Sequence, residues 1–312
     1  MINYAPVAVF AYTRLEHLKQ TLQSLNDADL ANETELFIFC DNYKTEKDRV
    51  KVENVRKYVS EFSKSTNFKS VTIKKAAHNM GLKNSIISGV SELMNGFGCA
   101  IVVEDDLQVS KFFLRYMNDA LTFYKNNNKV WAVSGYSFPM KALNNYKYDI
   151  YFTGRGCSWG WGSWSDRWNS IDWSVSDYGS FKHNWKKRLE FSKWGADLPT
   201  MLDAQMISNI NSWAVIWCYN AFKQNMLTVY PRESFIKNLG NDGSGTHGST
   251  SDIVYETFLY NEEHYAIEFA NPFLDSLIEK EFFKKYTGSF GLFAKDQIKG
   301  LLRRTGLYKR HK

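Results

Sequence analysis

Three consecutive carboxylates, Glu104, Asp105 and Asp106, follow directly on the apolar run 100–103. At the end of a buried strand such groups repel one another and lose hydration, so a site that gathers them usually holds a cation. Mg²⁺ and Mn²⁺ prefer oxygen ligands and commonly bridge a protein carboxylate to substrate phosphates. The residues alone support a second interpretation equally well, in which this acidic triplet forms the N-terminal turn of a helix expected from about Lys111 and is stabilised by the helix dipole.

Polar residues follow other apolar runs in the same way. Arg14, Asp41, and the pair His78 and Lys83 come after the first, second and third apolar runs of the chain. A cation for a phosphate, a carboxylate for a base or ribose hydroxyl, and an imidazole beside a ring are what a nucleotide pocket needs at one edge. Each residue alone is also consistent with a helix cap or a solvated loop, so the inference depends on their occurring together.

The first 135 residues contain the elements that would position these side chains. Five apolar runs alternate there with helical patterns of about 10 to 15 residues, and they lie at 7–11, 36–40, 70–73, 100–103 and 130–134. This alternation predicts an α/β fold with a mostly parallel, doubly wound sheet flanked by helices. In such sheets ligands bind beyond the carboxyl ends of the strands, which is where the acidic triplet and Arg14 fall.

The second half of the chain has a different composition. Nine of the ten tryptophans lie between Trp159 and Trp217, mixed with Gly and Ser. Their rings suit the C–H faces of sugars, but a Trp-rich core explains any one of them equally well. The stretch 238–251 is rich in Gly, Ser and Asn, a composition typical of a flexible loop.

Size and charge exclude several classes of protein. The 312 residues can bury a core without a disulfide or metal, and 44% hydrophobic with 23% charged residues exclude a disordered or integral-membrane chain. The net charge of +6 comes from residues 279–312, which hold ten Lys and Arg against three Asp and Glu. The remainder is nearly neutral, so no nucleic-acid partner is expected. Four scattered cysteines and the lack of a signal-peptide pattern predict a cytoplasmic protein with reduced thiols.

Several stretches of the sequence resemble one family. The run 102–116, in which the acidic triplet precedes an apolar residue and a paired Phe, is similar to glycosyltransferases of the GT-A fold. It resembles in particular the N-acetylglucosaminyltransferase I type and bacterial surface-polysaccharide (O-antigen or capsule) enzymes of the family 2 kind. The similarity includes 152–164 and 230–240 and covers about residues 5–250. It implies transfer of a sugar, with inversion, from a nucleotide diphosphate donor, preferably a UDP-sugar, to a glycan acceptor in polysaccharide or lipopolysaccharide synthesis.

The resemblance also implies a cofactor, Mn²⁺ or Mg²⁺, and roles for single residues. Asp106 would bind the metal, Glu104 and Asp105 the donor sugar and ribose, Arg14 the diphosphate, and Asp41 and His78 the nucleobase, with Lys83 in the same donor pocket. The segment 156–164, with Gly156, Trp159 and Trp161, would line the donor sugar and the acceptor. Residues 240–251 would form a lid that excludes water, in which His247 would be a second metal ligand or a phosphate contact.

One position departs from the family pattern. Where the N-acetylglucosaminyltransferase I type has its catalytic Asp after a Trp, this chain has Ala214 after Trp213. An alanine cannot accept a proton, so the base that deprotonates the acceptor hydroxyl must come from elsewhere. We expect Asp203 or Asp242 to take this role.

Three parts of the chain are expected. Residues 1–135 would be the nucleotide-sugar-binding half and 136–278 the acceptor and lid half of one domain, while 279–312 would be a basic amphipathic tail. Within the tail, 290–312 mixes apolar and basic residues in a pattern that suits an anionic membrane surface, where a lipid-linked glycan would be the acceptor and the protein would attach peripherally. A C-terminal helix packed on the domain explains the pattern equally well.

Two other classes of protein remain compatible with the sequence. A sugar nucleotidyltransferase can share the fold and the acidic metal site, but it usually has a Gly-rich phosphate loop after the first strand, where this chain reads 11–14 as Ala-Tyr-Thr-Arg. A non-catalytic carbohydrate-binding protein would explain the tryptophans and Ala214 but would have little use for the acidic triplet.

Overall fold

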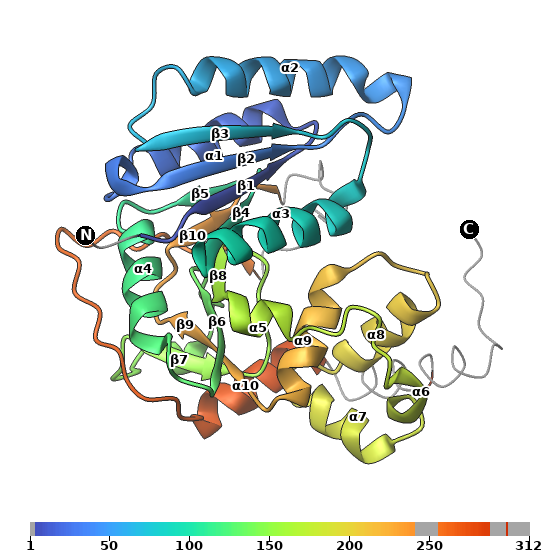
Figure 1. Cartoon of the computed structure of the whole chain (residues 1–312). Helices are drawn as coiled ribbons and strands as arrows, with labels where there is room; N and C mark the ends of the chain where they lie inside the picture. The colour runs from blue at the N-terminus through green and yellow to red at the C-terminus, as the bar shows by residue number, and fades with distance from the viewer. Residues whose placement is uncertain (1–3, 241–254, 288–297, 299–312) are drawn as a thin grey trace.

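The computed structural model describes residues 4–240, 255–287 and 298. Its centre is a sheet of eight strands in the order β3-β2-β1-β4-β8-β6-β9-β7 (Figure 1). The strands of this sheet are β1 (Val7–Ala11), β2 (Glu35–Cys40), β3 (Ser70–Lys75), β4 (Cys99–Glu104), β6 (Val130–Ser134), β7 (Ile150–Thr153), β8 (Trp161–Trp164) and β9 (Leu227–Pro231).

The sheet combines a parallel half with a mixed half. The β2–β3, β1–β2, β1–β4 and β6–β9 pairs are parallel, whereas β8 enters between β4 and β6 antiparallel to both, and β7 lies antiparallel to β9. All five strands expected in the first 135 residues are present. The predicted fold class, an α/β fold with a mostly parallel sheet flanked by helices, is confirmed. Because β8 comes from the second half of the chain, both halves share one sheet.

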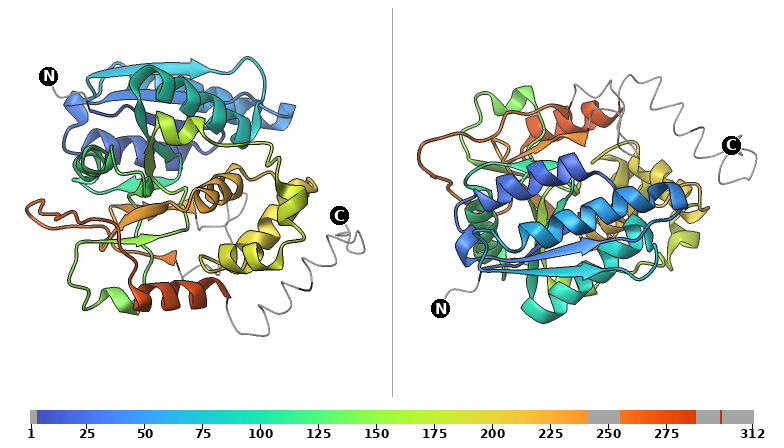
Figure 2. Two further views of the ribbon diagram at one scale, coloured as in Figure 1. Left: turned by 60° about the horizontal axis from the view of Figure 1, so that its bottom comes forward. Right: turned by 90° about the horizontal axis from the view of Figure 1, so that it is seen from above.

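Alternate residues of the buried strands face two separate cores, as the period of a strand requires. On β1, Val7 and Val9 belong to one core, whereas Ala8 and Phe10 belong to the other. Helices cover both faces of the sheet (Figures 1 and 2). The core that contains Val7 and Val9 also contains side chains from α1 (Leu15–Asn26), α2 (Glu46–Phe62) and α4 (Phe113–Tyr124). The core that contains Ala8 and Phe10 also contains side chains from α3 (Gly81–Phe97), α5 (Ser165–Asn169), α6 (Tyr178–Phe181), α7 (Trp185–Ser192), α8 (Leu198–Met206) and α9 (Trp213–Lys223).

A small second sheet, which the sequence pattern did not predict, follows the acidic triplet. In it β5 (Leu107–Val109) pairs antiparallel with β10 (Ile236–Asn238). Strands of three residues are too short to give a recognisable alternation. Their pairing lets the amide of Leu239 donate to the carbonyl oxygen of Asp106 at 2.8 Å. The segments 102–116 and 230–240, far apart in the sequence, are therefore neighbours.

The C-terminal part of the described chain packs on the domain. Helix α10 (Ser276–Thr287) runs across the boundary expected at 278/279, and its Ile278 and Phe282 are buried, the latter against Phe138. Two short 3₁₀ helices, η1 (Ala31–Glu33) and η2 (Lys141–Leu143), complete the described elements. Within the described ranges no helix is both long and apolar enough to span a bilayer. Apart from residue 298, the predicted membrane segment 290–312 lies outside the described residues.

Candidate active site

Arg14 and the acidic triplet meet at one edge of the sheet. β1 and β4 are parallel neighbours with Phe10 opposite Glu104, so residues that follow both strands emerge side by side. The Arg14 guanidinium forms ion pairs with both aspartates, at 3.0 Å to Asp105 Oδ1 and 2.9 Å to Asp106 Oδ2. The structure thus brings together Arg14 and the three residues of the acidic triplet, all of which were predicted site residues. Arg14 is the counter-ion of the two aspartates.

One guanidinium does not neutralise the acidic triplet. The side chains of Asp105 and Asp106 are only 8% and 11% exposed. Burial raises the pKa of Asp105 to about 6 even though the Arg14 charge opposes the change. Burial also raises the pKa of Glu104 to about 8, and the charges of Asp106 and Asp105 add to this effect. The fully ionised triplet would thus carry more negative charge than Arg14 balances, and the raised pKa values reflect this.

This excess of buried negative charge fits a divalent cation. No group of three or more Asp, Glu, His or Cys side chains within the described ranges is arranged to hold a metal by itself. Mg²⁺ and similar ions need no such group, since they are commonly bound through one or two carboxylates together with substrate phosphates and water. Asp106, and with it Asp105, would supply the protein ligands. Gly240 packs directly on the Asp106 carboxylate, where a Cβ would overlap Oδ2.

Asp41 organises the turn between β3 and α3. Its carboxylate accepts hydrogen bonds from the amides of Met80 at 2.8 Å and Gly81 at 2.9 Å, and from Asn79 Nδ2 at 3.1 Å. These contacts satisfy amides at the start of α3, which a carboxylate also stabilises through the helix dipole. They bring the adjacent His78, which is exposed, and Lys83, which is half-buried, to the same edge of the sheet. The nucleobase contacts of Asp41 and His78 remain predictions.

The tryptophans predicted to bind sugar differ in their exposure. Trp161 lies in β8, is 0% exposed, and packs on Trp217 with ring centroids 4.7 Å apart, so its predicted place in the donor pocket is wrong. The core interpretation holds for this residue because β8 is a central strand. Trp159 is half-buried and packs edge-on to Tyr136. Gly156 lets the chain pass over the Trp217 ring, which a Cβ would overlap.

Asp203 is not available as the catalytic base. It is 1% exposed and forms two hydrogen bonds to the Arg188 guanidinium, at 2.9 and 2.8 Å, and a third to the Tyr178 hydroxyl at 3.0 Å. A base must reach the proton that it accepts, and a buried carboxylate paired with Arg188 cannot reach an incoming hydroxyl. The sequence prediction fails because the neighbouring α7 supplies a buried arginine.

A second ion pair, which the sequence analysis missed, lies in the acceptor half. Asp197 forms two hydrogen bonds with Arg155, both at 2.8 Å, and its side chain remains 31% exposed. Gly195 makes room for the pair, since a Cβ at this position would overlap both Arg155 and Asp197. No signal in the sequence marked this pair, because Arg155 and Asp197 are 42 residues apart and meet only through tertiary packing.

Arg155 lies in the segment 154–160, which connects β7 with β8. β8 runs antiparallel to β4 with Trp161 opposite Val102, so the segment before Trp161 approaches the carboxyl end of β4. Burial raises the pKa of the Cys157 thiol, and the charges of Arg155 and Glu104 both act on that thiol as well. One thiol thus lies within electrostatic range of both groups of charges.

Three other predicted positions add little to this geometry. Ala214 is half-buried in the first turn of α9, whose N-cap Ser212 accepts a hydrogen bond from the Val215 amide at 3.4 Å. Asp242 and His247 lie outside the described residues.

Comparisons with known proteins give only a distant likeness. No protein-family model matches the chain, and no curated protein does. Among solved structures, S. aureus TarS 1–349 is 11% identical over 75% of this chain and 59% of that one, with a TM-score of 0.43. The same fragment in complex with UDP-GlcNAc is 12% identical over 80% of this chain and 63% of that one, with a TM-score of 0.43. The chain thus spans about three fifths of the TarS fragment.

An archaeal structure gives a similar result. The mannosyltransferase PcManGT from Pyrobaculum calidifontis, in complex with GDP-Man and Mn²⁺, is 12% identical over 71% of this chain and 73% of that one, with a TM-score of 0.41. At such identities and scores, the chemistry of this chain follows from its own side chains and not from the likeness.

Proposed function

We propose that the protein is a metal-dependent glycosyltransferase that moves a sugar from a nucleotide diphosphate donor to a glycan acceptor. The observation that supports this most is the acidic triplet at the carboxyl end of β4, whose two aspartates are buried and whose charge is only partly balanced by Arg14 from the end of β1. Nucleotide ligands of open α/β sheets bind at such strand ends. A UDP-sugar is the favoured donor, and the edge formed by Asp41, His78 and Lys83 is the proposed nucleobase side.

The residues of this chain would act mainly on the leaving diphosphate. When bound, Mn²⁺ or Mg²⁺ supplies positive charge that stabilises the departing phosphates. Asp106 and Asp105 would hold that cation, and Arg14, released from its two ion pairs, would contact the diphosphate. Glu104 would contact the donor sugar, and the segment 240–251 would exclude water from it.

On the opposite side of the donor sugar, we propose Asp197 as the base in place of Asp203. Asp197 is partly exposed, and Arg155 fixes its orientation through two hydrogen bonds. A carboxylate on the acceptor side would accept the hydroxyl proton as the glycosidic bond forms, with inversion at the anomeric carbon. The acceptor would be a growing glycan of bacterial polysaccharide or lipopolysaccharide, free or lipid-linked, used at the cytoplasmic face of the membrane.

The test is turnover of a panel of nucleotide sugars with Mn²⁺ by the full chain and by Asp106→Asn. We expect release of the nucleoside diphosphate by the wild type and a loss of at least a hundredfold in the variant, since the chemistry depends on this carboxylate. Substantial Mn²⁺-dependent activity in Asp106→Asn would contradict the assignment. A nucleotidyltransferase would instead release pyrophosphate from a nucleoside triphosphate and a sugar phosphate, and a carbohydrate-binding protein would turn over neither.

A further inference from the structure

Helix α7 has one buried and one exposed side. Phe191 is 0% and Arg188 4% exposed, and both face the domain. In contrast, Trp185 is 75% and Leu189 52% exposed. These two side chains are four residues apart, so they lie one above the other on the same face of the helix. Among the tryptophans of the second half, Trp185 is the one that the fold leaves mostly in solvent.

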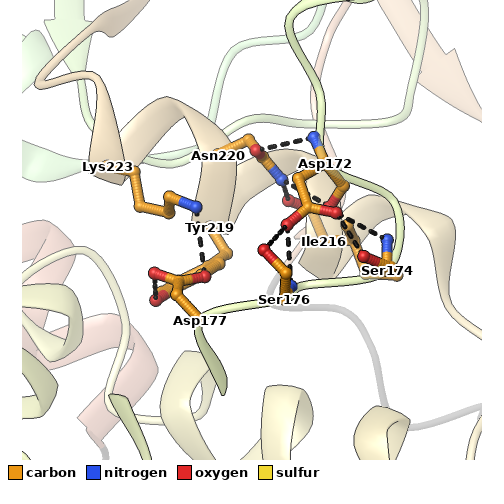
Figure 3. A network of polar contacts seen from close by, with 8 residues as sticks. All are labelled: Asp172, Ser174, Ser176, Asp177, Ile216, Tyr219, Asn220 and Lys223. Atoms are coloured by element: carbon orange, nitrogen blue, oxygen red, sulfur yellow. Dashed lines mark hydrogen bonds and ion pairs between the residues drawn. The ribbon is translucent and has the colours of Figure 1, made fainter. Parts of the chain in front are cut away.

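The exposed face of α7 is held in place from behind. Arg188 is bound to the buried Asp203 at 2.9 and 2.8 Å, and the side chain of Asn184 caps the helix by accepting from the Lys187 amide at 3.1 Å. The segment 172–177, which leads toward α7, is tied to α9 by the polar network in Figure 3, in which Asp177 accepts from Tyr219 at 2.9 Å and from Lys223 at 3.0 Å. The exposure of Trp185 is thus a feature of an anchored helix.

Positive charge borders the apolar pair. Lys186, Lys187 and Lys193 are exposed, and none of them forms an ion pair with a residue in the described part of the chain. By helical periodicity, Lys186 and Lys193 lie beside the stripe formed by Trp185 and Leu189. Lys187, two residues from both Trp185 and Leu189, lies on another face of the helix, so we call Trp185, Leu189, Lys186 and Lys193 the α7 patch.

We propose that the α7 patch docks the protein on an anionic membrane surface. Trp is favoured at the boundary between lipid headgroups and acyl chains, and lysines beside it are attracted to anionic headgroups. Helix α7 lies at the outer edge of the molecule, on the opposite side from α2 (Figure 1), so it can present this stripe to a flat surface. Two apolar side chains are too few for a stable protein interface, which buries about 1,000 Å² or more, whereas peripheral attachment combines a small apolar insertion with electrostatic attraction.

The test is co-sedimentation of the full chain with vesicles of phosphatidylglycerol and phosphatidylcholine in a 1:3 ratio, at about 50 and 500 mM salt. Two double variants address the two parts of the patch: Trp185→Ala with Leu189→Ala, and Lys186→Glu with Lys193→Glu. The matched control is Phe258→Ala, which removes an aromatic side chain that is 95% exposed elsewhere on the protein. Circular dichroism melts check that each variant is folded.

We expect the wild type to bind these vesicles at low salt, to bind pure phosphatidylcholine weakly, and to lose binding at high salt. Each double variant should bind more than tenfold more weakly, and Phe258→Ala should bind like the wild type. The proposal is overturned if the wild type does not bind anionic vesicles, or if the double variants bind as it does. A change in sedimentation mass of the free protein, without a change in vesicle binding, would assign the patch to a second copy and would also overturn it. Nucleotide-sugar turnover in solution, measured in parallel, tests the proposed function independently.

Discussion

Replacing Arg14 by Gln removes the counter-ion of two buried carboxylates and should destabilise the protein in a pH-dependent way. Both ion pairs are short, at 3.0 and 2.9 Å, and the carboxylates are 8% and 11% exposed. Removing one partner of a buried pair costs about 3 to 5 kcal/mol. Because Arg14 is partly exposed and the carboxylates can take up protons, we expect a loss of about 3 kcal/mol at pH 8.

The sign of the pH dependence follows from the pKa of Asp105. Burial raises this pKa to about 6, and Arg14 opposes the rise, so the variant should have a still higher folded-state pKa. When a carboxyl has a higher pKa in the folded than in the unfolded state, the protein loses stability as the pH increases from the unfolded-state pKa through the folded-state pKa. At pH 5 the carboxyl is largely protonated in the folded variant, and the loss relative to wild type should be about 1 kcal/mol.

Urea unfolding followed by tryptophan fluorescence at pH 5 and pH 8 measures both free energies. The control is Arg115→Gln, whose ion pair with Asp29 is as short, at 2.6 Å, but much less buried, with 37% and 31% of the side chains accessible. It should cost less than about 1 kcal/mol at either pH. Adding Mn²⁺ should restore more stability to Arg14→Gln than to the wild type, because the cation replaces the missing charge. Equal losses at both pH values, or no greater effect of Mn²⁺ on the variant, would refute the electrostatic argument.

Three other substitutions test the remaining parts of the site. Gly240→Ala should lower the affinity for Mn²⁺ at least tenfold, measured by a titration followed by electron paramagnetic resonance, because the added Cβ would displace the Asp106 carboxylate. The control is Gly96→Ala, which has open space around it and should not change the affinity. Unchanged affinity in Gly240→Ala would contradict the placement of Asp106 at the metal site. Asp203→Asn should cost about 3 kcal/mol or more in urea unfolding, because it leaves Arg188 buried without its carboxylate, and the folded variant should keep its kcat. Asp197→Asn should instead lower kcat by about a hundredfold or more with little change in the KM of the donor; a normal kcat would exclude it as the base.

The first half of the fold could be predicted because its elements carry long patterns. Leu18, Leu22 and Leu25 recur at helical spacing and are buried in α1, and the apolar run 100–103 is buried in β4. A parallel sheet places the ends of β1 and β4 together, so the association of Arg14 with the acidic triplet could be expected from order and pattern alone. The direct ion pairs could not, because they depend on the side-chain geometry of the β1–α1 turn.

The second half could not be predicted to the same extent. Trp161 and Trp159 are two residues apart in similar sequence surroundings, yet Trp161 lies in a central strand and Trp159 in the connecting segment before it. Asp197 is the N-cap of α8 and Asp203 lies within that helix. The buried Arg188 of α7 pairs with Asp203, which gives Asp203 a structural role and leaves Asp197 as the candidate base. Such differences arise from tertiary packing between helices, which a single sequence does not record.

The most direct test of the central claim is calorimetric titration of UDP-sugars into the wild type and Asp106→Asn, each with and without Mn²⁺. If the acidic triplet forms a metal and nucleotide-sugar site, at least one donor should bind the wild type only when Mn²⁺ is present, and Asp106→Asn should bind it at least tenfold more weakly. Binding that is equally strong without Mn²⁺ and in the variant would contradict the account.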